Sequence, residues 1–192
     1  MHTILFDFLE GYVSLTDDEK NAILALDVFH SVPKGTVLLE TGQRSNKSFF
    51  VLRGCLRKYY IIDGDERTTA FFTEMEAVTP HCVADDTPSE YSIDCLEDCI
   101  LVISSADMEP EVNGRFPKFE TLCKKLSEER LGKQQIEFDE FKTSSPEQRY
   151  LNVLQKRPDL VQRVPQHQLA SFLGITPQSL SRLRARILER KN

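Results

Sequence analysis

The stretch from Thr176 to Lys191 concentrates side chains that hydrogen-bond to bases or neutralise phosphates. Glutamine matches the edge of adenine and arginine matches that of guanine, each through paired hydrogen bonds. We therefore predict base contacts from Gln178, Ser179 and Arg182. Phosphate contacts, which position a protein on DNA without reading its sequence, are predicted from the other polar and basic residues of the stretch: Thr176, Ser181, Arg184, Arg186, Arg190 and Lys191.

Two short helices must position these residues. Residues 166–173 have the apolar spacing of a helix, and Gly174 ends it by supplying the positive φ of a tight turn. Thr176 followed by Pro177 is an N-cap with proline at the first helical position, so a second helix begins there. Such a pair is the helix-turn-helix unit, whose second helix enters the major groove. The alternative is a purely structural helical hairpin with a solvated basic face.

The net charge changes sign along the chain. Residues 143–192 carry nine Lys or Arg against three Asp or Glu, a net charge of +6, whereas residues 1–142 carry a net charge of −12. Phosphate neutralisation needs local positive charge, so this division favours DNA binding by the C-terminal part. We place the domain boundary near Lys142.

Composition restricts the class of protein. With 192 residues, 40% of them hydrophobic, and a mean hydropathy of −0.35, the chain fits two modest globular domains. No apolar run approaches the roughly 20 residues of a membrane span, and the N-terminus lacks a signal-peptide pattern, so we expect a cytoplasmic protein without membrane contact. We expect no enzyme, because the four histidines are scattered and no phosphate-loop, metalloprotease or serine-hydrolase motif occurs.

Five cysteines without a CxxC pair suit a reducing compartment. Cys55, Cys95 and Cys99 lie in strand-like contexts, and we interpret them as core residues. The alternative is a metal or iron-sulfur site of Cys82, Cys95 and Cys99 with His81, although the spacing matches no standard ligand pattern. His81 or Cys82 would also be the ligand available to a haem. We predict no metal and no cofactor.

Residues 1–115 are expected to form a β-roll with flanking short helices, the second of which is capped by Thr16. From Gly35 to Gly64, glycines recur at spacings of 7 to 12 residues and separate stretches rich in β-branched and aromatic residues. Many short, evenly spaced strands are typical of a sandwich or barrel, here a double-stranded β-helix of the cupin-like jelly-roll kind. We predict strands at residues 36–39, 48–52, 56–62, 68–72, 91–93 and 99–103.

A long connecting helix is predicted for residues 117–141, within a segment of residues 116–142. A narrow apolar seam suggests pairing with the same helix of a second copy, so we predict a homodimer. Packing of this helix on the chain's own β-roll is the alternative. The predicted seam consists of Phe119, Leu122, Leu126 and Ile136.

This order of elements resembles the CRP/FNR family of bacterial transcription regulators over nearly the whole chain. The most specific segments are 32–38 with Gly42, 49–54 and 169–182, and residues 88–93 and 96–98 resemble a subgroup from Bacteroidetes. The resemblance implies an α+β chain in three parts. These are a cyclic-nucleotide-binding-like effector domain at residues 1–115, a dimerisation helix at 116–142 and a helix-turn-helix domain at 143–192. It also implies base contact by Arg182 and makes RNA polymerase a candidate partner.

The expected effector pocket departs from the cyclic-nucleotide-binding members. The family holds the phosphate with Gly-Glu followed by Arg-Ser or Arg-Thr, whereas this chain has no glycine between Gly64 and Gly114 and has Tyr91-Ser92 in place of Arg-Ser. Residues 72–91 contain five acidic residues and no basic one. We therefore expect no binding of cyclic AMP or cyclic GMP at physiological concentrations. The predicted pocket residues are Phe72, Glu74, Glu76, Tyr91 and Ser92.

The sequence thus predicts a homodimer that reads an inverted repeat in double-stranded DNA through the helix starting at Pro177. An effector would reorient the DNA-binding domains about residues 137–145. The alternative is a small-molecule or partner-sensing β-roll protein whose DNA binding is weak or lost. Salt-dependent binding to a duplex distinguishes the two.

Overall fold

The computed structural model describes residues 2–108 and 116–190 of the chain. It divides into two compact units, residues 1–58 with 71–130 and residues 59–70 with 131–192. These units cut across the three expected segments. Residues 59–70 group with the C-terminal helices, and the long helix is divided between the units after residue 130.

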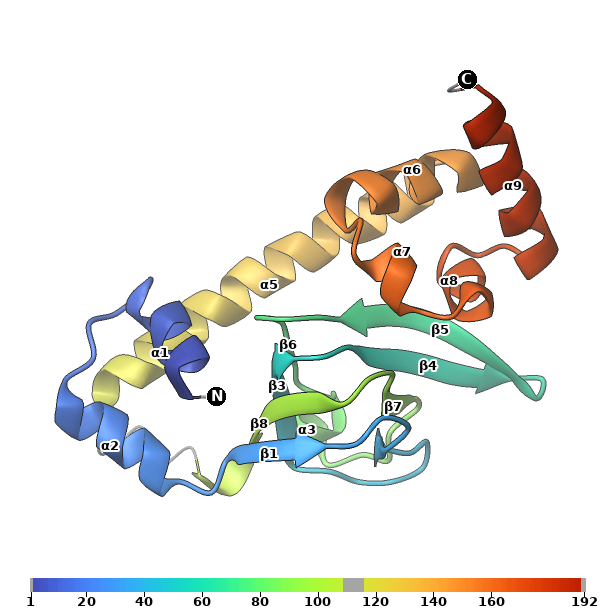
Figure 1. Cartoon of the computed structure of the whole chain (residues 1–192). Helices are drawn as coiled ribbons and strands as arrows, with labels where there is room; N and C mark the ends of the chain where they lie inside the picture. The colour runs from blue at the N-terminus through green and yellow to red at the C-terminus, as the bar shows by residue number, and fades with distance from the viewer. Residues whose placement is uncertain (1, 109–115, 191–192) are drawn as a thin grey trace. The chain divides into compact units, whose positions relative to one another are not determined.

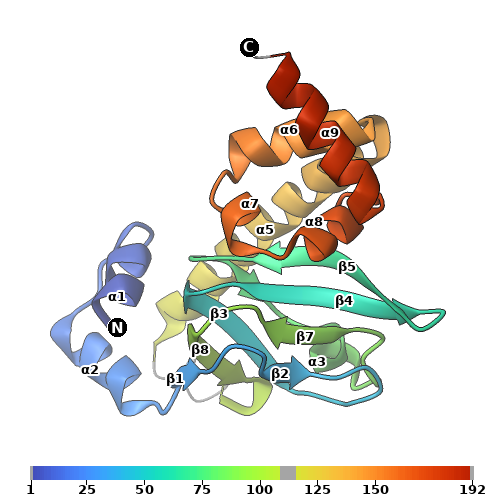
Figure 2. The same cartoon turned by 45° about the vertical axis from the view of Figure 1, so that its right-hand side comes forward.

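The strands of the described residues form two four-stranded sheets (Figures 1 and 2). One has the order β1 (Phe29–Val32), β8 (Cys99–Ser105), β3 (Lys47–Arg53) and β6 (Ala77–Val78). The other has the order β2 (Val37–Leu39), β7 (Ser92–Cys95), β4 (Leu56–Ile62) and β5 (Asp65–Phe72). Each predicted strand has a counterpart here, whereas β1 and β6 were not predicted.

Strand β8 organises the first sheet. It pairs antiparallel with both β1 and β3, so that Val102 lies opposite Phe29 on one side and Phe50 on the other. The sheets contribute apolar side chains to a common core, and each large side chain removed from water stabilises the fold by about 1.5 to 3 kcal/mol. The residues of this core that are almost fully buried are Leu39, Val51, Leu52, Leu56, Phe71, Ile93 and Leu101.

The turn between β3 and β4 requires glycine. Gly54 has a φ of +108°, and a Cβ added there would lie 2.5 Å from the Sγ of Cys99 and 3.0 Å from its Cα. The register between β3 and β8 also shifts between Val51 and Arg53. The chain therefore passes so close to β8 at this turn that no side chain fits.

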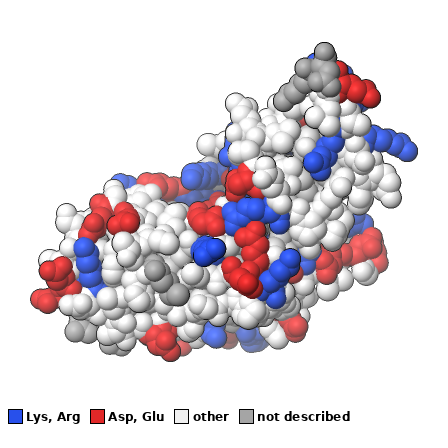
Figure 3. Space-filling model, viewed as in Figure 1, with Lys and Arg blue, Asp and Glu red and all other residues white. Residues whose placement is uncertain are grey.

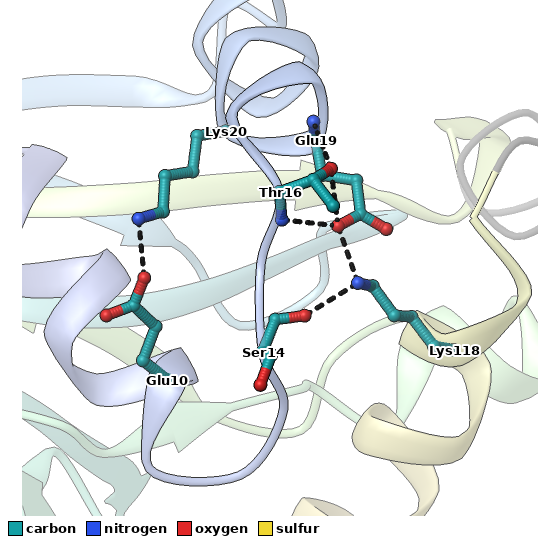
Figure 4. Close-up of polar contacts among 6 residues, drawn as sticks. All are labelled: Glu10, Ser14, Thr16, Glu19, Lys20 and Lys118. Carbon is teal, nitrogen blue, oxygen red and sulfur yellow. Dashed lines mark hydrogen bonds and ion pairs between the residues drawn. The ribbon is translucent and has the colours of Figure 1, made fainter.

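Two helices precede the sheets, α1 (His2–Glu10) and α2 (Asp17–Ala25). The predicted N-cap is confirmed: the Thr16 Oγ1 accepts from the Glu19 N–H at 3.3 Å, and the Glu19 carboxylate accepts from the Thr16 N–H at 2.8 Å. Lys118 then donates to Glu19 at 2.5 Å and to the Ser14 carbonyl at 2.7 Å (Figure 4). This contact lowers the pKa of Glu19 and ties the first turn of the long helix to the start of α2.

The long helix α5 spans Pro117–Thr143, which confirms the predicted connecting helix. Its first half packs on its own chain. Phe119 and Leu122 are buried in a cluster with Leu5, Ile23 and Leu52, and Leu126 packs against that cluster. This corrects the predicted homodimer seam for these three residues: the N-terminal helices and β3 supply the apolar surface that was expected from a second copy.

The second half of α5 carries exposed apolar side chains. Leu131 is 66% exposed, Ile136 60% and Phe138 56%. A contiguous patch of such side chains marks an interaction surface, whereas single exposed apolar residues are common. Of the predicted seam, only Ile136 belongs to this half.

Four helices follow α5, and two short helical segments, α3 (Cys82–Asp85) and η1 (Ala106–Met108), lie among the strands. The four are α6 (Pro146–Lys156), α7 (Leu160–Arg163), α8 (Gln166–Phe172) and α9 (Pro177–Glu189). Their shared core consists of Tyr150, Leu160, Leu169, Leu173, Leu180, Leu183 and Ile187. Within residues 2–108 and 116–190, no helix combines the length and apolar character needed to cross a membrane.

Candidate nucleic-acid interface

Helices α8 and α9 are joined by the tight turn that the sequence predicted. Gly174 has a φ of +72°, and the Ile175 N–H donates to the Ala170 carbonyl at 3.0 Å. Thr176 caps α9 by accepting from the Ser179 N–H at 3.1 Å, and Pro177 occupies its first turn. Hydrogen bonds and the left-handed backbone conformation of Gly174 therefore fix the turn.

Helix α9 buries one stripe and exposes the opposite one. Leu180, Leu183 and Ile187 are buried, whereas the predicted base-contacting residues Gln178, Ser179 and Arg182 are exposed. The Ser179 hydroxyl accepts from Thr176 Oγ1 at 3.0 Å, so it contributes to the helix cap as well. Gln178 and Arg182 have no such local partner within the described chain.

The predicted phosphate-contacting residues differ in their surroundings. Ser181 and Arg184 are exposed, and neither has an ion pair or side-chain hydrogen bond with the part of the chain that the structure describes. Arg186 and Arg190 instead bind the Glu147 carboxylate of α6, at 2.5 Å and 2.7 Å. Lys191 lies outside the described residues. On the face drawn in Figure 3, basic side chains project near the C-terminal end of the chain.

The Arg149 side chain of α6 contacts both the turn before α9 and the end of α5. Its Nη1 donates to the Leu173 carbonyl at 2.8 Å and its Nε to the Ser144 carbonyl at 3.1 Å. Its guanidinium stacks on the Phe141 ring at 3.9 Å from the ring centroid. Gly174 lies directly against this pair, since an added Cβ would be 3.1 Å from Arg149 and 3.4 Å from Phe141. The end of α5 and the turn before α9 are thus joined by one side chain.

The outer part of the β4–β5 hairpin contacts α8. The Ser171 hydroxyl accepts from the Thr68 N–H at 2.9 Å and donates to the Glu66 carbonyl at 3.4 Å. Sequence reasoning missed both this contact and that of Arg149 with Leu173, because neither has a local pattern and the partners are 105 and 24 residues apart.

The predicted effector residues, which belong to the other unit, bind mostly to nearby backbone. Glu74 accepts from the Gly54 N–H at 2.8 Å, and Glu76 accepts from the Thr73 N–H at 2.8 Å. Ser92 accepts from the Thr41 N–H at 3.0 Å, and the Tyr91 hydroxyl accepts from the His81 N–H at 3.3 Å. These carboxylates and hydroxyls therefore support the loops around the sheets.

Two cations lie near the predicted effector residues, which corrects the expectation drawn from residues 72–91 alone. Arg130 of α5 lies 3.5 Å from Glu76 and stacks on Phe72 at 5.5 Å from the ring centroid. Lys58 of β4 lies 4.9 Å from the Tyr91 ring centroid. Burial lowers the pKa of Lys58, and the Arg130 charge lowers it further. Both cations come from elements far from residues 72–91 in sequence.

The cysteines confirm the interpretation as core residues. Cys55, Cys82, Cys95 and Cys99 are buried, and Cys123 is exposed. A hydrogen bond with Cys99 and burial raise the pKa of Cys95. Among the described residues, no group of three or more His, Cys, Asp or Glu side chains is placed to hold a metal ion.

The segment of the chain that carries the strands matches a known domain family. Residues 29–109 match the family model described as cyclic nucleotide-binding domain. No curated protein sequence matches the chain.

Several solved structures share the fold. A c-di-GMP responsive global regulator from Xanthomonas campestris is 17% identical, with a TM-score of 0.67 over 89% of this chain and 91% of that one. A structure described as a putative transcriptional regulator of the CRP/FNR family, from Eubacterium rectale, is 19% identical, with a TM-score of 0.67 over 91% and 85%. The Catabolite Activator Protein of Thermus thermophilus is 20% identical, with a TM-score of 0.55 over 94% and 87%. The chain thus has the fold of CRP/FNR-type regulators and carries a segment that matches the cyclic nucleotide-binding domain family.

Proposed function

We propose that this chain is a cytoplasmic, DNA-binding transcription regulator of the CRP/FNR type that reads the major groove with α9. The observation that carries the proposal is the exposure of Gln178 and Arg182 opposite the buried stripe of α9. These two side chains present paired hydrogen-bonding groups to adenine and guanine. The α8–α9 pair serves as a helix-turn-helix, with RNA polymerase as a candidate partner on the promoter.

Phosphate contacts position this helix on the duplex. Thr176, Ser181 and Arg184 surround the base-reading face, and residues 143–192 carry a net charge of +6. Arg186 and Arg190 are already ion-paired with Glu147, so phosphates compete with that carboxylate for both guanidinium groups. Lys191 adds a further cation to the same end of the chain.

The protein acts as a homodimer through the second half of α5. Leu131 and Phe138 are seven residues apart, so they fall on one stripe of the helix, and both are exposed. We assign the seam to these two residues, in place of Phe119, Leu122 and Leu126. Ile136 is two residues from Phe138 and five from Leu131, so it lies on another face of the helix. A two-fold axis along this seam would match an inverted-repeat operator. An effector would act by reorienting the helices about residues 137–145.

The effector unit does not bind cyclic AMP or cyclic GMP at physiological concentrations. Tyr91 replaces the arginine expected to neutralise the cyclic phosphate, and Arg130 is already paired with Glu76. Calorimetric titration of either nucleotide should therefore give no heat of binding, and micromolar affinity would contradict this part of the proposal.

Selection of bound duplexes from a random library, followed by a salt titration on any enriched site, tests the proposed function. We expect enrichment of an inverted repeat and a steep loss of affinity with salt. The second candidate is a small-molecule or partner-sensing protein with weak DNA binding, which the ion pairing of Arg186 and Arg190 favours. Under that candidate no sequence is enriched.

A further inference from the structure

One carboxylate of α6 holds two arginines of α9. Glu147 Oε2 lies 2.5 Å from Arg186 Nη2, and Glu147 Oε1 lies 2.7 Å from Arg190 Nη1. The two arginines are four residues apart, so they project from the same side of the helix one turn from each other. Each oxygen of the carboxylate therefore accepts from a different guanidinium, and both arginines are drawn toward α6.

The remaining arginines of α9 are placed differently. Neither Arg182 nor Arg184 makes an ion pair with residues 2–108 or 116–190. Arg182 lies on the exposed face with Gln178, whereas Arg186 and Arg190 lie on the flank that faces α6. The helix thus presents its base-reading arginine to solvent and keeps two other arginines bound to a carboxylate.

We propose that Glu147 competes with DNA phosphates for Arg186 and Arg190 and so lowers the affinity of α9 for duplexes of any sequence. Binding to random DNA depends almost wholly on phosphate neutralisation, so this competition affects it directly. Binding to an operator also depends on base contacts by Gln178 and Arg182, which Glu147 does not touch. Phosphate contacts act on all sequences alike, so Glu147 lowers affinity for random and operator duplexes by a similar factor. This inference rests on the proposed DNA-binding function.

The test compares Glu147→Gln with the wild-type chain on two fluorescein-labelled duplexes, one of random sequence and one enriched by selection. Anisotropy is measured over a series of salt concentrations. Exposed ion pairs are each worth a factor of about 1.4 to 5, so we expect random-duplex affinity to rise about 2- to 25-fold. The salt slope should steepen by up to about 1.8, since each neutralised phosphate contributes about 0.9. The gain on the enriched duplex should be similar, because phosphate contacts act on all sequences alike.

Asp159→Asn is the matched control, because it removes an exposed carboxylate of the same unit whose ion-pair partner, Arg163, is not a predicted DNA contact. A second test adds changes at the two arginines. The pair of changes Arg186→Gln and Arg190→Gln should weaken random-duplex binding less in the wild-type background than in Glu147→Gln, because Glu147 competes for both arginines only in the wild type. The same pair should remove the gain when Glu147 is Gln. Thermal melting by circular dichroism checks each variant.

The outcomes separate the two proposals. If the wild-type chain binds duplexes and Glu147→Gln behaves as Asp159→Asn, the role of Glu147 is refuted and DNA binding stands. A gain confined to one of the two duplexes also refutes competition for phosphate-contacting arginines. Equal losses from the arginine changes in both backgrounds would show that Glu147 does not compete for them. If no variant binds any duplex at low salt, the proposed function itself fails, and the inference with it.

Discussion

Replacing Arg149 with alanine should destabilise the C-terminal helices more than any ordinary surface substitution. The side chain donates to the Leu173 and Ser144 carbonyls and stacks on Phe141. A hydrogen bond from a charged donor contributes about 1.5 kcal/mol or more, and a partly exposed cation–π contact about 0.5 to 1 kcal/mol. Because Arg149 is only half-buried, we expect a total loss of about 2 to 4 kcal/mol.

Urea denaturation followed by circular dichroism measures this loss. With a slope of about 2 kcal/mol per molar urea, a loss of 3 kcal/mol lowers the midpoint by about 1.5 M. Arg67→Ala is the matched control, because Arg67 of the same unit forms an exposed ion pair with Asp65, for which we expect about 0.5 kcal/mol. Arg149→Lys keeps the charge without the two-pronged geometry and should fall between them. If Arg149→Ala costs no more than Arg67→Ala, the contacts that Arg149 makes with the end of α5 and with the turn do not stabilise this unit.

Three further predictions concern other parts of the chain. Gly54→Ala should cost about 3 kcal/mol or prevent folding, because the new Cβ would lie 2.5 Å from the Cys99 Sγ; thermal melting measures this. Arg182→Ala should weaken binding to the enriched duplex by about 1 to 3 kcal/mol and to random DNA much less, and equal losses would exclude base reading. Lys58 has a lowered pKa in the folded state, so the unfolded chain binds more protons between that value and the ordinary lysine pKa. Stability should therefore rise with pH across that window for the wild type and not for Lys58→Met, as urea titrations at successive pH values would show.

Local signals explain what the sequence predicted well. Gly174, Thr176 and Pro177 each act within a few residues, through a positive φ, a cap and a fixed φ, so the turn before α9 was predicted in position and conformation. The apolar stripe of α9 was predicted for the same reason, because helical spacing alone decides which residues share a face.

Partners far apart in sequence explain what was missed. Phe119 and Leu122 have the spacing of a seam, but spacing does not say whether the apolar surface that covers them comes from the same chain or from a second copy. The cations near Glu76 and Tyr91 come from α5 and β4, so a count of charges within residues 72–91 could not include them. Glu147 is 39 residues from Arg186, and no local sequence pattern predicts that ion pair.

The two hydrogen bonds of the Ser171 hydroxyl with β5 affect whether this strand can pair with another molecule. Strand β5 is the last strand of its sheet, and the unpaired backbone groups of an outermost strand are a template for pairing with another molecule. The Thr68 N–H on β5 instead donates to Ser171, and the Glu66 carbonyl accepts from the same hydroxyl. One side chain of α8 thus occupies two backbone hydrogen-bonding groups on the outer edge of β5. A chain cut before α8 would leave that strand uncovered and prone to aggregate through it.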